Sequence, residues 1–193
     1  MYYKEFLGAV AIAITCFAYV PYIRAILGGT IKPHVFSWII WGSATFVVGA
    51  AQLDDGGGPG GFAILVSGFI SLIIALLAYL KRADISITMT DWLFLGSAMM
   101  SLPLWYLTSD PLWAVVILTV VDVLGFGPTV RKAYAFPHTE SVSFFILFII
   151  RNLVVIAALD NYSVTTLFFP AVVVVACIGL VTMLLVRRRA LPA

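Results

Sequence analysis

Seven long stretches of this chain carry at most one charged residue each. Five are uncharged, and two are interrupted by a single charge. They cover residues 6–23, 33–53, 56–80, 92–109, 111–130, 141–159 and 161–186. Each is close to the roughly 20 residues that an α-helix needs to cross a bilayer. The sequence therefore predicts an all-α integral membrane protein with seven transmembrane helices.

The composition leaves no room for a large soluble domain. Of the 193 residues, 63% are hydrophobic and 10% are charged, whereas soluble proteins carry about 25% charged residues. Cys16 and Cys177 both fall inside predicted spans and have no metal-type spacing. We expect no metal and no cofactor. The N-terminal apolar run lacks a basic segment before it, so we expect a retained first helix.

The basic residues predict an orientation in the membrane. Placing the N-terminus outside puts nine of the eleven Lys and Arg residues at cytoplasmic helix ends, as the positive-inside rule requires. Of the other two, Lys4 lies outside and Arg151 lies within a span. We therefore expect the N-terminus outside and the C-terminus in the cytoplasm. Separately, the compactness of the chain favours a bacterial inner membrane.

The two halves of the chain repeat each other at an offset of 107 residues. This offset places Pro21 on Pro128 and Arg24 on Arg131, and it continues without a gap through the next span. One helix between two three-helix repeats leaves them parallel, related by an axis along the membrane normal. The expected 3+1+3 organisation is a first repeat at 1–83 (spans 6–27, 33–53 and 58–80), a linker helix within 84–109, and a second repeat at 110–193 (spans 111–131, 140–159 and 163–186).

This pattern, with a proline near the inner end of the first helix of each repeat and a short basic loop after it, resembles the PQ-loop and SWEET transporter superfamily. The resemblance covers nearly the whole chain, although Tyr22 and Thr129 stand where the Pro-Gln dipeptide would place glutamine. It implies alternating access around a central pocket, with the third helix of each repeat between the first two. Sugar-carrying members resemble one another in an asparagine on the third helix, and residues 62–80 and 167–186 contain none, which argues against a sugar.

Two charged residues lie deep within apolar runs. Asp122 comes twelve residues after Asp110, and Arg151 eleven residues after Glu140, so both are expected near the middle of a hydrocarbon layer about 30 Å thick. Charges at that depth are costly and mark functional sites. We expect Asp122 and Arg151 to meet directly, through water, or across a solute in a central cavity.

Each of the two charges suggests a role. A carboxylic acid in an apolar pocket can take up and release a proton as its surroundings change, and proton-coupled members of the resembling family are similar in carrying an acid on this helix. Asp122 is therefore predicted to couple protons; the alternative is a permanent structural strut between Asp122 and Arg151. The planar guanidinium of Arg151 suits a carboxylate, so an anionic or zwitterionic solute is expected.

Other candidates are weaker. Asn152 follows Arg151 at about 100° around the helix, so the two are not expected to share a face. Trp41 is a possible platform for an apolar solute or a cation, with core or lipid packing as the alternative. The candidates are Arg151, Asn152, Trp41, Thr15 and Thr45 for substrate binding, Asp122 for proton coupling, Pro21 and Pro128 as hinges or static kinks, and His34 and His138 as interfacial anchors. The glycine-rich segment 56–61 is expected to be a flexible outer loop.

The sequence predicts a transporter of a small polar solute that works by alternating access. The alternatives are a non-transporting protein of the same fold, such as a sorting receptor or a lipid scramblase, and a sugar or vitamin facilitator. A transporter needs its buried charges to face a cavity, whereas a scramblase needs a polar groove open to lipid. No enzyme is expected, because no nucleophile with a base, HExxH motif or carboxylate cluster occurs. The expected partners are the solute and the bilayer, and no nucleic acid.

Overall fold

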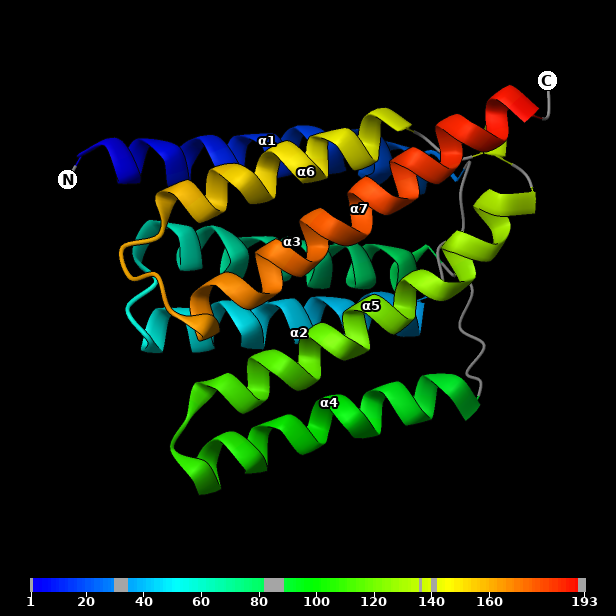
Figure 1. Ribbon diagram of the computed structural model, residues 1–193. Coiled ribbons are helices and arrows are strands. Elements are labelled where there is room, and N and C mark those ends of the chain that lie inside the picture. Colours follow the sequence, from blue (N-terminus) through cyan, green and yellow to red (C-terminus); the bar gives the residue numbers. More distant parts are fainter. Residues whose placement is uncertain (1, 30–34, 82–88, 136, 140–141, 191–193) are drawn as a thin grey trace.

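The computed structural model describes residues 2–29, 35–81, 89–135, 137–139 and 142–190 (Figure 1). These residues contain helices and no strand, so the predicted all-α class is confirmed. The helices are α1 (Tyr2–Leu27), α2 (Val35–Asp54), α3 (Gly58–Leu80), α4 (Met89–Thr108), α5 (Pro111–Ala135), α6 (Val142–Ala158) and α7 (Val164–Ala190), with a short 3-10 helix η1 at Pro137–Thr139.

Four of these helices, α1, α2, α3 and α7, are long and apolar enough to cross a membrane by length and composition. This indicates a membrane protein. Two apolar helical stretches among the described residues are shorter, namely Pro111–Phe126 within α5 and the whole of α6. The finer arrangement of seven spans stays a prediction.

Two helices extend past the charges that were expected to end them. α5 continues to Ala135 and α7 to Ala190, because a charge marks the edge of the hydrocarbon layer without interrupting helical hydrogen bonds. The extension of α7 is held in place by its arginines. Arg187 Nε donates to the carbonyl of Tyr134 at 3.1 Å and Arg188 Nε to that of Pro137 at 3.0 Å. Residues 33, 34, 140 and 141 of the predicted spans lie outside the described residues.

The helices form two layers (Figure 1). In the first unit, α1 to α3, helix α3 lies between α1 and α2 and packs against both; in the second unit, α5 to α7, helix α7 lies between α5 and α6 in the same way. Across the layers α1 packs on α6 and α2 on α5, while α3 also meets α6 and α2 also meets α7. If the two units are exchanged, the α1–α6 contact becomes the α5–α2 contact, and the α3–α6 contact becomes the α7–α2 contact. α4 flanks the bundle against α5 and α2.

The backbones of α2 and α3 approach closely at glycines. A Cβ added to Gly49 would collide with the backbone nitrogen of Leu65, and one added to Gly68 with that of Phe46. Small residues at such contacts let helices within a membrane pack at short range. α2 and α3 therefore form a tightly packed pair.

This contact gives a testable prediction. We expect Gly49→Ala to lower the melting temperature in detergent, since overpacking costs about 1–3 kcal/mol. Gly179→Ala on α7 is the matched control, because its Cβ would meet nothing within 4 Å, and it should leave the melting temperature unchanged or raised. Equal melting temperatures for the two variants would contradict the close packing of α2 on α3.

Charge is divided between the two ends of the bundle. The termini lie at opposite ends (Figure 1). Asp54 and Asp160 lie at the end that carries the N-terminus, called the acidic end below, whereas Lys81 and Arg187 lie at the opposite, basic end. The chain order of the helices therefore separates the two kinds of charge as the sequence predicts.

Candidate functional site

A cavity of about 680 Å³ lies between the two layers, lined by residues from all six helices of the two units. This volume falls within the roughly 300–1,000 Å³ of small-molecule sites. Residues 17–22 of α1, 38–45 of α2 and 143–152 of α6 contribute to the lining. On each of these helices they lie nearer the basic end or the middle. Phe169 and Val173 of α7 lie nearer the acidic end. The cavity therefore occupies the middle of the bundle and extends toward the basic end.

Aromatic side chains form one wall of this cavity. The rings of Tyr22 and Trp38 are 5.0 Å apart between centroids, and Trp38 meets Trp41 edge to face at 6.1 Å. Tyr19 meets Phe148 of α6 edge to face at 6.0 Å. The Trp38 indole N–H also donates to the Tyr22 hydroxyl at 3.3 Å. These contacts fix the rings in place before any ligand arrives.

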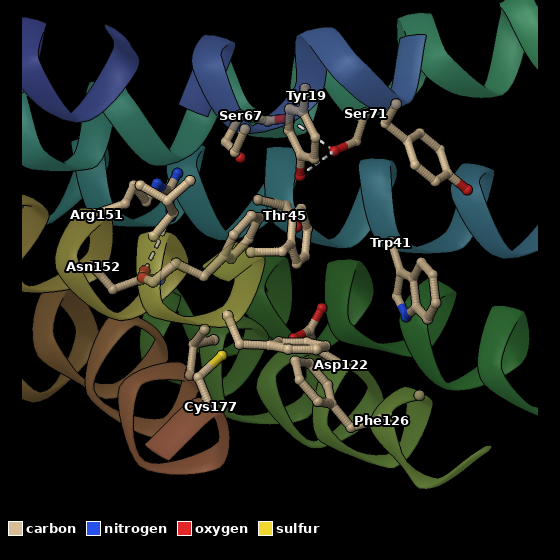
Figure 2. A pocket seen from close by; sticks show the side chains of 18 of the residues that line it. Tyr19, Trp41, Thr45, Ser67, Ser71, Asp122, Phe126, Arg151, Asn152 and Cys177 are labelled. Carbon is tan, nitrogen blue, oxygen red and sulfur yellow. Dashed lines mark hydrogen bonds between the residues drawn. The ribbon is translucent and has the colours of Figure 1, made fainter. Parts of the chain in front are cut away.

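Asp122 projects from α5 into the same cavity and is partly exposed there (Figure 2). Within the described part of the chain, its carboxylate has neither a hydrogen bond nor an ion pair. Gly125 lies one turn further along α5, and a Cβ there would come within 2.5 Å of Trp41 Nε1. The Trp41 indole thus meets α5 with its N–H edge, one turn from Asp122.

Arg151 is anchored in the protein by neutral acceptors. Its side chain is 3% exposed. Nε donates to the Thr15 hydroxyl at 3.2 Å, Nη1 to Asn152 Oδ1 at 3.0 Å and Nη2 to the carbonyl of Ala63 at 3.3 Å. Arg151 therefore ties α6 of the second unit to α1 and α3 of the first.

Asp122 and Arg151 line one cavity without touching each other. Among the described residues, the one ion pair within 4.0 Å joins Lys4 and Asp160. Direct pairing, one of the three arrangements expected from the sequence, is therefore not found. The two charges lie on separate walls (Figure 2), with room for water or a solute between them.

The other predicted site residues divide into two groups. Asn152, Trp41, Thr45 and Pro21 line the cavity. Thr15 is 2% exposed and lies outside the lining, where it supports Arg151 and donates to the carbonyl of Ala11 at 2.8 Å.

One expectation, on Asn152, needs correction, and three other candidates stay untested or lie outside the described residues. Asn152 hydrogen-bonds Arg151 although it was expected to point away, because the long arginine side chain bridges the angle between the two positions. α1 continues past Pro21 to Leu27, the end of the predicted span 6–27, and the role of Pro21 as a hinge or a static kink stays a prediction. The side chain of Pro128 and all of His34 lie outside the described residues, and His138 lies in η1.

Sequence reasoning missed a polar face of α3. Ser67 and Ser71 line the cavity, and the Tyr19 hydroxyl lies 3.3 Å from Ser71 Oγ. Their spacing of four residues within an aliphatic span was a usable signal, because residues i and i+4 share one helix face. Of the two cysteines within predicted spans, Cys177 is buried and also lines the cavity, whereas Cys16 is exposed.

At the acidic end, the turns that follow α2 and α6 are bound to each other. The Ser163 hydroxyl donates to Asp55 Oδ2, and Asn161 Nδ2 donates to the carbonyl of Asp55 at 2.8 Å. The backbone N–H of Asp160 donates to the carbonyl of Gly57 at 3.3 Å. We call this set of contacts between residues 52–58 and 159–166 the acidic-end latch.

Two further side chains complete the latch. Lys4 forms an ion pair with Asp160 at 3.4 Å and donates to the carbonyl of Leu159 at 2.7 Å. Gln52 is fully buried, and its Nε2 donates to the carbonyl of Thr166 at 3.0 Å. Within the described residues Gln52 Oε1 has no partner, and an unsatisfied buried acceptor costs about 1–3 kcal/mol. One buried acceptor within these contacts is therefore left unsatisfied.

No group of three or more His, Cys, Asp and Glu residues in the described part of the chain could hold a metal ion. In comparisons with known proteins, no family model, curated protein or solved structure matches this chain. The resemblance to the PQ-loop and SWEET superfamily therefore stays an expectation from the sequence pattern.

Proposed function

We propose that this protein is a membrane transporter of a small polar solute that works by alternating access. The observation that carries the proposal is the cavity between two three-helix units, which has two charged residues in its lining and a latch across one end. The interchange of contact pairs between the units supports two parallel repeats related by an axis along the membrane normal. In this proposal all seven helices span the membrane, and α4 is the linker.

The position of the charges supports transport over lipid scrambling. A scramblase needs a polar groove on the surface that faces lipid, whereas Asp122 and Arg151 line a cavity between helices. The choice between a transporter and a receptor depends on whether that cavity has access to both sides of the membrane in turn.

The separation of charge supports an orientation. Basic residues favour the cytoplasmic side, which would place the basic end in the cytoplasm and the acidic end outside, in a bacterial inner membrane. The cavity would then face the cytoplasm, and the acidic-end latch would seal the outside. Release of the latch, with hinge motion near Pro21 and Pro128, would expose the cavity to the other side.

Proton coupling is part of the proposal. A transporter couples protons when a titratable group in the cavity is accessible in turn from each side. Asp122 is a titratable group of this kind within the cavity, because its carboxylate is partly exposed there and has no protein partner among the described residues. Access from each side in turn is what the labelling experiment below measures.

The test follows access to the cavity without knowledge of the solute. A cysteine replaces Ser71 in a chain carrying Cys16→Ala and Cys177→Ala, and membrane-impermeant thiol reagents are added to either side of oriented vesicles. A transporter should be labelled from both sides, whereas a receptor with one stable opening should be labelled from one. Asp54→Cys and Arg189→Cys are the controls, expected to react from outside and from the cytoplasm respectively; the reverse pattern would overturn the orientation.

A further inference from the structure

The charges in the cavity are not equally available to a ligand. Among the described residues, two charged side chains line it, Asp122 and Arg151. Arg151 is 3% exposed and directs three N–H groups at protein acceptors. Asp122 is partly exposed and uncommitted. Three of the five N–H groups of Arg151 are therefore taken up by the protein, whereas the carboxylate of Asp122 keeps all of its acceptor positions for a ligand.

The surroundings of Asp122 are aromatic. Trp41 packs against Gly125 one turn away, Trp38 meets Trp41 edge to face, and Phe126 also lines the cavity (Figure 2). The face of an aromatic ring is negative and attracts a cation lying over it. An anion placed in this corner would meet the carboxylate of Asp122 with the wrong sign, whereas a cation would be attracted by it.

From these two observations we propose that the cavity binds a small organic cation with an apolar body, with Asp122 as its counter-ion and Trp41 as the aromatic wall beside it. The inference rests on the proposed function and names its solute class. It replaces the anionic or zwitterionic solute expected from Arg151, because the guanidinium is engaged by Thr15, Asn152 and Ala63.

The same carboxylate accounts for the coupling. One carboxylate neutralises either a proton or a monovalent cation, so binding of the cation displaces the proton and the exchange is electroneutral, one for one. The other titratable groups in the described lining are Arg151 on α6, Tyr19 and Tyr22 on α1, and Cys177 on α7; the described residues of α2 and α4 add none. Asp122 is therefore the one carboxylate in the described lining of the cavity.

The probe that tests the proposal is benzyltrimethylammonium, titrated by calorimetry into the purified protein in detergent at alkaline pH. Phenylalanine, phenylacetate and benzyl alcohol are the comparison ligands: each carries the same phenyl ring, and they are zwitterionic, anionic and neutral respectively. We expect the cation to bind at least about tenfold more tightly than each of the other three, and equal or tighter binding of any of them would overturn the proposal. This binding is measured without transport. If the cation does not bind preferentially, the proposed solute class is wrong, whereas the proposed transport is still tested separately by labelling at position 71 from both sides.

Variants test the two residues named. Asp122→Asn should weaken binding of the cation at least about tenfold, whereas Asp54→Asn, which removes an exposed carboxylate at the acidic end, should not. Trp41→Leu should weaken it by about threefold to thirtyfold, with Trp113→Leu as control, since Trp113 is 51% exposed outside the cavity lining.

The pH dependence provides a readout in the unmodified protein. The dissociation constant for the cation should rise by up to about tenfold for each unit that pH falls below the titration of the carboxyl, because one proton competes for one site. In Asp122→Asn this dependence should disappear. A pH-independent affinity in the unmodified protein, or full affinity in a folded Asp122→Asn variant, would overturn the role of Asp122.

Discussion

Replacing Arg151 by leucine should lower the melting temperature in detergent sharply, whereas replacing Asp122 by asparagine should leave it unchanged or raise it. Leucine leaves the acceptors on Thr15, Asn152 and Ala63 facing an apolar side chain, at about 1–3 kcal/mol for each buried group left unsatisfied. It also removes the link from α6 to α1 and α3. Asparagine at 122 loses no partner among the described residues and removes a charge from an apolar segment, where a charge is costly.

The double variant separates this account from a structural strut. If Asp122 and Arg151 stabilised each other as a pair, the second change would recover part of the loss caused by the first. Since the two side chains form no ion pair, we expect the effects on melting temperature to add. Arg189→Leu, at the exposed basic end, is the control for loss of a positive charge. Recovery in the double variant would restore the strut interpretation.

The repeat itself explains why the two charges do not pair. Arg151 on α6 reaches Thr15 on α1. At the 107-residue offset, Thr15 is the counterpart of Asp122, and Arg151 is the counterpart of Ala44. Exchanging the units therefore places Asp122 opposite Ala44 on α2, where no charge is available. The position of Asp122 and Arg151 deep within apolar runs predicted that both face the cavity. Which side chain each of them contacts depends instead on which helices meet across the two layers.

The helices were predictable for a similar physical reason. A long apolar segment in lipid has to satisfy its own backbone hydrogen bonds, so it is helical wherever its ends fall. The ends were less predictable, because the arginines after residue 186 continue α7 and bind carbonyls near the end of α5.

The acidic-end latch was not predictable from local sequence. Segment 56–61 was expected to be a flexible outer loop. Instead Gly57 is buried, and residues 58–61 belong to α3. Gly58 has a φ of +57°, and a Cβ on Gly60 would meet the carbonyl of Val155 at 2.6 Å. These glycines bring the first unit against the second, and such a contact between segments about 100 residues apart has no signature in either segment alone.

Locking the latch should abolish alternation. We expect Asp55→Cys with Ser163→Cys, in the chain that lacks Cys16 and Cys177, to form a disulfide on oxidation, since the two native side chains are in direct hydrogen-bonding contact. If the latch seals the outside, labelling of a cysteine at position 71 should then persist from the cytoplasmic side and disappear from outside. Reduction should restore outside labelling, because only the movement of the two turns has been blocked.

The converse change tests the same contacts without a cross-link. Asp55→Ala removes the acceptor of the Ser163 hydroxyl, so it should shift the protein toward the state open at the acidic end and speed outside labelling at position 71. Each single cysteine variant, oxidised in the same way, controls for the chemistry. Undiminished outside labelling in the cross-linked protein would mean that the cavity reaches the outside by another route, and the latch would then be a structural contact instead of a gate.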